Sequence, residues 1–266
     1  MPSSDPQLSW HDRDVPVSTQ FDDPYYSLEN GLQETQHVFL AGNDLPQRFC
    51  HRFHIAELGF GTGLNLLATL ALWRASGVTG QLQFTSFEAY PMAADQMTRA
   101  LAHFTPLEPL GKEFAPLWPE LCTHGRIETD ELCLNVLFGD ARKTLPNWQG
   151  QADCWFLDGF SPAKNPELWG ADLLKSVYDH TANGGTAATY TAAGFVRHNL
   201  ELAGFTVKRS KGFGRKRHMT QAIKGTIKGI NRIISLEIVP SHCFACIDVC
   251  SEDKVSMVVV VNCLNL

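Results

Sequence analysis

The chain has 266 residues, 44% of them hydrophobic and 19% charged, which is enough for one domain with a full hydrophobic core. Its formal net charge of −6 excludes a protein that coats nucleic acid indiscriminately, but it allows a local basic surface. The first thirty residues contain no basic start followed by an apolar run, and the run at 255–261 is too short to cross a bilayer. The sequence therefore predicts a soluble, cytoplasmic protein with no membrane segment.

The eight cysteines predict free thiols and no disulfide framework. Cys50, Cys122, Cys133 and Cys154 are scattered along the chain, and the last two lie in strand-like apolar runs. Reduced, buried thiols are typical of a cytosolic chain of this length. We expect no metal site.

The chain order predicts three regions. Residues 1–50 form an N-terminal segment packed on the main domain, because polar residues and prolines precede a stretch of aromatics and turn formers. Residues 51–222 form the main domain. Residues 223–266 hold four of the cysteines and a valine run, do not continue the pattern of the main domain, and form a divergent tail of unknown structure.

The main domain alternates short apolar strands with stretches of helix length, and leucines recur at helical spacing after the first and fourth strands. This alternation predicts an α/β fold with a Rossmann-like, mostly parallel, doubly wound sheet, whose ligand binds beyond the carboxyl ends of the strands. The predicted strands are Phe53–Leu58, Leu82–Phe87, Leu132–Phe138, Cys154–Leu157 and Thr186–Tyr190.

A glycine-rich turn follows the first predicted strand. Gly59, Gly61 and Gly63 let the backbone approach a ligand closely, but their spacing differs from the Gly-x-Gly-x-x-Gly of dinucleotide-binding proteins. Glu57 precedes the first glycine by two residues and suits a cationic, phosphate-free ligand such as S-adenosylmethionine; the alternative is a surface carboxylate at a strand end. The predicted cofactor-binding residues here are Glu57, Gly59, Gly61, Gly63 and Asn65.

Two further acids support an adenosine ligand. Glu88 closes the second strand, 25 residues after Gly63, where a carboxylate can accept both ribose hydroxyls. Asp140 follows the third strand and can accept from the adenine amino group, or can cap the N-terminus of a helix instead.

The fourth strand leads into a loop with a candidate catalytic residue. Asp158 begins the run Asp-Gly-Phe-Ser-Pro-Ala-Lys-Asn-Pro, at the carboxyl end of a buried strand. Cofactor and substrate should meet at this edge of the sheet, whereas an aspartate that caps a turn is the alternative.

The chain resembles the methyltransferase half of MnmC, the bifunctional enzyme that finishes the side chain of wobble uridine in certain tRNAs. The resemblance covers roughly residues 8–222, and the Asp158 run and the Gly-Phe-Gly-x-Lys-Arg run are far more discriminating than the glycine turn. The matching stretches are Asp23–Leu45, Ala56–Leu67, Ser86–Pro91, Trp155–Trp169, Thr189–Arg197 and Gly212–Met219.

The resemblance implies a class I methyltransferase that uses S-adenosyl-L-methionine to methylate 5-aminomethyl-2-thiouridine in the tRNA anticodon, giving 5-methylaminomethyl-2-thiouridine. In the family a flavin-dependent oxidase first exposes that amine. No second Gly-x-Gly-x-x-Gly follows residue 222, so we expect no oxidase and no FAD in this chain. A separate flavin-dependent oxidase would then supply the substrate.

Positive charge near the pocket is the expected tRNA-binding feature, since phosphate contacts need it. From Leu202 to Ser235 there are nine Lys or Arg residues and no acid, although such a run is also typical of a solvated face. Aromatic residues are candidates for pocket walls. The predicted substrate- or tRNA-binding residues are Phe160, Lys164, Tyr190, Arg197, Lys211, Arg215, Lys216 and Arg217.

Three other functions are compatible with parts of the sequence. One is a methyltransferase of the same fold that acts on a small molecule or a protein, which the loop at Asp158 does not favour. Another is a nicotinamide oxidoreductase, against which the glycine spacing and Glu57 argue. The third is a catalytically inactive RNA-binding module.

Overall fold

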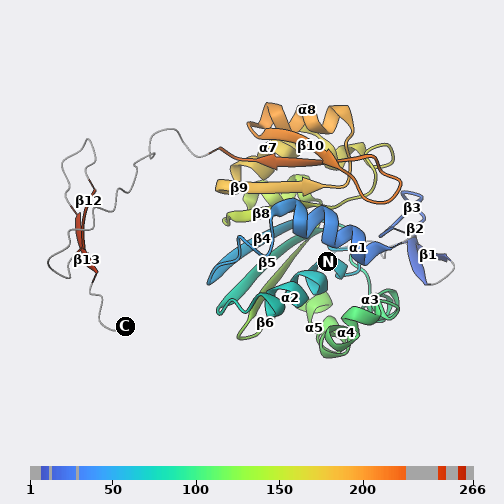
Figure 1. The fold of residues 1–266 in the computed structure, drawn as a ribbon. Helices are drawn as coiled ribbons and strands as arrows, with labels where there is room; N and C mark the ends of the chain where they lie inside the picture. The colour runs from blue at the N-terminus through green and yellow to red at the C-terminus, as the bar shows by residue number, and fades with distance from the viewer. Residues whose placement is uncertain (1–6, 12–13, 28–29, 226–244, 250–256, 262–266) are drawn as a thin grey trace. The chain divides into compact units, whose positions relative to one another are not determined.

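The computed structural model describes residues 7–11, 14–27, 30–225, 245–249 and 257–261, and the chain divides into two compact units, 1–225 and 226–266 (Figure 1). The described part of the second unit is an antiparallel pair of strands, β12 (Ala245–Val249) and β13 (Met257–Val261). The rest of the predicted tail, apart from 223–225, lies outside the described residues.

An eight-stranded sheet forms the centre of the first unit, in the order β10-β11-β9-β8-β4-β5-β7-β6 (Figure 1). The five strands β7, β5, β4, β8 and β9 are parallel, and β6 and β11 run antiparallel to them. The mostly parallel sheet predicted from the sequence is confirmed. The strands are β4 (Arg52–Leu58), β5 (Gln81–Glu88), β6 (Arg126–Glu128), β7 (Leu132–Phe138), β8 (Ala152–Leu157), β9 (Thr181–Thr189), β10 (Thr206–Lys211) and β11 (His218–Ile223).

Helices cover both faces of this sheet because alternate residues of its strands are apolar on both sides. In β8, Cys154 and Phe156 pack into the core that includes α2, whereas Trp155 and Leu157 pack into the core that includes α7 and α8. The fold is therefore doubly wound. The α-helices are α1 (Gly31–Thr35), α2 (Leu64–Ser76), α3 (Ala94–Leu101), α4 (Glu108–Phe114), α5 (Trp118–His124), α6 (Ala141–Thr144), α7 (Ala171–Asp179) and α8 (Gly194–Ala203).

The N-terminal segment packs beside the carboxyl ends of the parallel strands. Its small antiparallel sheet, β1 (Leu8–His11), β2 (Val15–Ser18) and β3 (Asp23–Pro24), lies on the side of the molecule where β9 ends (Figure 1). The Asp23 carboxylate accepts a hydrogen bond from the Ser161 backbone amide at 2.7 Å, and the Tyr26 hydroxyl donates to the Ala100 carbonyl at 2.9 Å.

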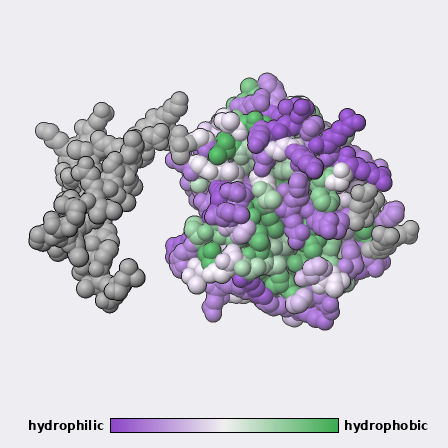
Figure 2. All heavy atoms as spheres, viewed as in Figure 1, coloured by the Kyte–Doolittle hydropathy of each residue, from purple (hydrophilic) through white to green (hydrophobic). Residues whose placement is uncertain are grey.

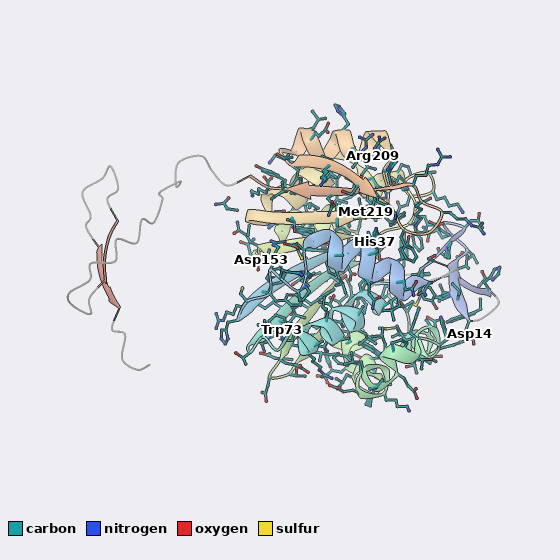
Figure 3. The ribbon with its side chains drawn as sticks, in the orientation of Figure 1. Asp14, His37, Trp73, Asp153, Arg209 and Met219 are labelled. Carbon is teal, nitrogen blue, oxygen red and sulfur yellow. The ribbon has the colours of Figure 1, made fainter. Side chains whose placement is uncertain are left out.

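The antiparallel hairpin β10–β11 is absent from the sequence prediction. The edge strand β10 exposes Lys208, Arg209 and Lys211, so it lacks the apolar alternation by which strands are recognised. In β11, by contrast, Met219 is buried in the core that also includes Val38, Phe39 and Leu40 of the short helix Gln36–Leu40 (Figure 3). The hairpin turn holds the Gly-Phe-Gly-x-Lys-Arg run.

No helix in the described part of the chain combines the length and the apolar character that crossing a bilayer requires.

Substituting Leu70 tests the packing of α2 on the sheet. Leu70 is fully buried, so we expect Leu70→Ala to lower the free energy of unfolding by about 2–5 kcal/mol. Leu202→Ala on α8, where 64% of the leucine is exposed, is the matched control and should change it by less than about 0.5 kcal/mol. Urea denaturation followed by circular dichroism measures both, and equal losses would contradict the described packing.

Candidate active site

A cavity of about 670 Å³ opens at the point where the strand order reverses. The strand β4 pairs with β5 on one side and with β8 on the other, so the connections from β4 and β8 leave in opposite directions. Residues from the turns after β4, β5, β7 and β8, from the N-terminal segment and from the hairpin line the cavity.

The glycine turn after β4 is closely packed between two other segments. Gly59, Gly61 and Gly63 all have positive φ, at 88°, 54° and 80°. A Cβ atom on Gly59 would lie 2.3 Å from the Asp158 carbonyl oxygen, and one on Gly61 would lie 3.2 Å from the ring of Tyr25. Glycine is therefore required at both positions by conformation and by space. Gly59 and Gly61 line the cavity, and Gly63 precedes the first residue of α2.

The side chain of Asn65, in the first turn of α2, links three elements of the site. Its Nδ2 donates to Oε1 of Glu57 at 2.8 Å and to Oδ2 of Asp158 at 2.7 Å, and its Oδ1 accepts from the Thr35 hydroxyl at 2.8 Å. Both amide hydrogens and the amide oxygen are thus engaged, which fixes the orientation of the side chain. Thr35 is a residue that the sequence reasoning did not single out.

Glu57 lies behind the cavity wall, although the sequence predicts it beside a cationic ligand. Its carboxyl group is fully buried and accepts from the Ser86 hydroxyl at 2.8 Å as well as from Asn65. Burial raises the pKa of Glu57 well above its usual range, and these hydrogen bonds oppose that change. The hydrogen bond from Asn65, which lines the cavity, connects Glu57 to the cavity wall.

Glu88 lines the cavity at the end of β5. Its two oxygens accept from the Gly61 amide at 2.8 Å and from the Tyr90 amide at 2.7 Å. Burial raises the pKa of Glu88, and the bonds from backbone amides oppose the change. Because Glu88 also lines the cavity, ligand hydroxyls can reach its carboxylate.

Asp140 caps α6 and also lines the cavity. Its carboxylate accepts from the Arg142 amide at 2.9 Å and pairs with the Arg142 guanidinium at 2.6 Å, which holds the pKa of Asp140 below its usual range. The helix-capping alternative is therefore observed. Its contact with an adenine ring stays a prediction.

Asp158 is the carboxylate best placed to exchange a proton. It is partly buried at the end of β8, and removal from water raises its pKa to about 7, while the hydrogen bond from Asn65 opposes that rise. The loop that follows is held from both sides. Trp169 Nε1 donates to the Phe160 carbonyl at 3.0 Å, and the Tyr190 hydroxyl donates to the Gly159 carbonyl at 2.7 Å.

The hairpin between β10 and β11 brings Lys216 into the cavity. The Lys216 Nζ lies 2.7 Å from Oε1 of Glu34 on α1 and 4.0 Å from the centre of the Tyr190 ring. Glu34 and Lys216 are 182 residues apart in the sequence. Glu34 falls within a stretch that carries the MnmC resemblance, but no local pattern marks it as a site residue.

An aromatic cluster forms the wall on the side of the N-terminal segment. Phe21 stacks on Phe160 with ring centres 4.7 Å apart, and Tyr25 meets Phe160 edge to face at 5.0 Å. Phe21 also contacts Tyr90 at 5.7 Å. Phe160 and Tyr190 line the cavity, and their contact with a substrate stays a prediction. For residues 21–50 the sequence indicated only that they pack on the main domain.

The predicted basic residues divide into two groups. Lys164 and Lys216 line the cavity, and Lys164 pairs with Asp22 of the N-terminal segment at 3.0 Å. The other four do not line it. Hydrophilic residues gather over α8 and β10 in the upper part of the molecule (Figure 2). Outside the cavity wall are Arg197 on α8, Lys211 at the end of β10, and Arg215 and Arg217 in the hairpin turn.

Comparisons with known proteins agree with this fold. Residues 106–225 match a family described as S-adenosyl-L-methionine-dependent methyltransferase. The chain is 43% identical over 224 residues to the tRNA 5-methylaminomethyl-2-thiouridine biosynthesis bifunctional protein MnmC of Marinomonas sp. and 40% identical over 235 residues to that of Caulobacter vibrioides. These matches cover 81% and 86% of the chain but 33% and 40% of the relatives, so the chain spans well under half of their length.

Among solved structures, MnmC2 from Aquifex aeolicus superposes with a TM-score of 0.69 at 24% identity, over 85% of this chain and 72% of that one. This likeness concerns the fold. The sequence comparisons show that the chain is similar to the MnmC proteins over most of its own length, and that residues 106–225 match the S-adenosyl-L-methionine-dependent methyltransferase family.

Proposed function

We propose that the chain transfers the methyl group of S-adenosyl-L-methionine to the primary amine of 5-aminomethyl-2-thiouridine at the wobble position of tRNA, giving 5-methylaminomethyl-2-thiouridine. The observation that carries the proposal is the placement of Asp158. It is a carboxylate with a pKa of about 7, bonded to Asn65 beside the glycine turn and open to a cavity. The names of the 40–43% identical relatives support the tRNA substrate.

The donor groups of the cavity fit this cofactor. Glu88 offers a carboxylate for ribose hydroxyls, and the close approach of Gly59 and Gly61 leaves backbone atoms accessible at the cavity wall. Asp140 and the aromatic wall are available to an adenine ring. Bound there, S-adenosyl-L-methionine supplies an activated methyl group.

Asp158 deals with the main chemical obstacle, which is that an alkylamine is protonated at neutral pH. An ordinary amine of this kind has a pKa near ~10.4, so its free base is scarce. The ionised Asp158 carboxylate can accept a proton from the amine and keep its nitrogen lone pair directed into the cavity. Asn65 holds that carboxylate in place, and Phe160 and Tyr190 line the same cavity as Asp158.

Positive charge around the rim of the cavity would hold the RNA backbone. Arg197 on α8, Lys211 at the end of β10 and Arg215 and Arg217 in the hairpin turn lie outside the cavity wall, and Lys164 lines the cavity. Recognition of a splayed single-stranded base beside such charges is typical of RNA-modifying sites. We further propose that a flavin-dependent oxidase, as a separate activity, exposes the amine that this site methylates.

Replacing Asp158 by Asn tests its role in proton transfer. We expect Asp158→Asn to lose at least about tenfold in turnover while it keeps S-adenosyl-L-methionine binding, because general bases contribute about 10²–10⁴-fold. The measurements are radiolabelled methyl transfer to hypomodified tRNA and calorimetric titration of the cofactor. Unchanged turnover would remove Asp158 from the mechanism.

The pH dependence of turnover provides a second test. Only the ionised Asp158 can accept a proton, so in the natural protein turnover should fall as the pH decreases through about 7. The Asn variant should lack this inflection. A wild-type profile with no inflection between pH 6 and 8 would contradict the assignment.

Charge reversal at the hairpin tests the RNA surface. We expect Lys211→Glu with Arg217→Glu to weaken tRNA binding and to lower the salt slope by about one for each phosphate that the protein no longer neutralises. Lys112→Glu with Lys175→Glu is the matched control, since both lysines lie on helices and do not line the cavity. Filter binding over a range of salt concentrations measures both. Equal tRNA affinity of the two double variants would show that the hairpin charges are solvated and do not bind RNA.

A further inference from the structure

A cation-binding corner of the cavity contains a lysine of the protein itself. Glu34 on α1 supplies a carboxylate whose side chain is only 12% exposed, and Tyr190, directly after β9, supplies an aromatic face. The Lys216 ammonium lies 2.7 Å from the carboxylate oxygen and 4.0 Å from the ring centre. A carboxylate combined with an aromatic face is the pair of groups that recognises an alkylammonium ion.

This corner adjoins the candidate catalytic carboxylate. The negative charge of Glu34 raises the pKa of Asp158 and the positive charge of Lys216 lowers it, so both groups are close enough to influence it. Asp158, Glu34, Tyr190 and Lys216 all line the one cavity. The Tyr190 hydroxyl donates to the Gly159 carbonyl, which orients the ring towards the loop that begins at Asp158.

Lys216 reaches this corner from a surface turn. The turn is closed by hydrogen bonds from the Gly212 amide to the Arg217 carbonyl at 3.1 Å and from the Lys216 amide to the Phe213 carbonyl at 3.0 Å. The Lys216 side chain is 46% exposed, in contrast to Glu34. Rotation of its unbranched stem can therefore move the ammonium group into water while the strands β10 and β11 stay paired.

We propose that Glu34 and Tyr190 form the site that receives the primary ammonium group of the substrate, and that Lys216 fills this site until the substrate displaces it. The inference rests on the proposed function, in which the substrate carries an aminomethyl group. That group and the lysine side chain are both primary alkylammonium ions. Once seated on Glu34, the substrate nitrogen lies beside Asp158, which accepts its proton.

Binding of a small probe tests the site without any methyl transfer. We expect Lys216→Met to bind ethylammonium about tenfold more tightly than the natural protein, because the site is no longer filled by an internal competitor. Adding Glu34→Gln or Tyr190→Leu to that variant should abolish the gain. Lys208→Met, in β10 of the same hairpin but outside the cavity wall, is the matched control. Ligand-observed NMR gives the affinities, with 1-propanol as the uncharged comparison.

Steady-state kinetics on tRNA distinguish a lysine that the substrate displaces from a lysine that binds phosphate, because the two roles change KM in opposite directions. A displaced lysine predicts that Lys216→Met lowers KM for the tRNA, whereas a phosphate-binding lysine predicts that the same change raises KM. Lys216→Gln, a polar replacement, should behave as the Met variant does. A raised KM in both variants would overturn the inference.

The two readouts separate this inference from the function on which it rests. Unchanged ethylammonium affinity in Lys216→Met overturns the ammonium site, whether or not tRNA is methylated. A gain in ethylammonium affinity that depends on Glu34 supports the site. If that gain is found and hypomodified tRNA is not methylated, the site is retained and the proposed substrate is wrong.

Discussion

The active site depends on the two hydrogen bonds that the Asn65 amide donates to Glu57 and Asp158. Each carboxyl group is drawn out of bulk water, and a buried polar group without a partner costs about 1–3 kcal/mol. One amide nitrogen supplies a donor to each of them. The Thr35 hydroxyl holds the amide from its other end, so the ends of β4 and β8, the start of α2 and the helix α1 are tied together at one side chain.

The position of the cavity follows from the strand order and from the glycine turn. The reversal of strand order between β4 and β8 opens a crevice, and the glycine turn leaves room beside it for a ligand. The fold alone would leave that crevice open. The N-terminal segment closes one side with Phe21 and Tyr25, and the β10–β11 hairpin closes another with Lys216. The side of the pocket next to the sheet is therefore available to a cofactor, and its open side is available to a substrate.

Local patterns in the sequence were sufficient to predict the parallel strands, the glycine turn and the position of Asp158. Each of these is marked by consecutive residues, such as an apolar run followed by glycines or by Asp158-Gly159. Glu34 and Thr35 could not be found in this way, because their partners lie 182 and 30 residues away and only the fold brings them together. Glu57 shows a different limit. Its motif places it at the end of the strand, but the three-dimensional packing buries it behind Asn65 and away from the cavity.

Calorimetric titration of the purified 266-residue chain with S-adenosyl-L-methionine tests the central claim most directly. The account predicts saturable binding with one site per chain, measured at two temperatures so that a small enthalpy at one of them is not mistaken for the absence of binding. A chain that shows no saturable heat at either temperature would contradict the assignment of this cavity as a methyl-donor site, and with it the role of the network around Asn65.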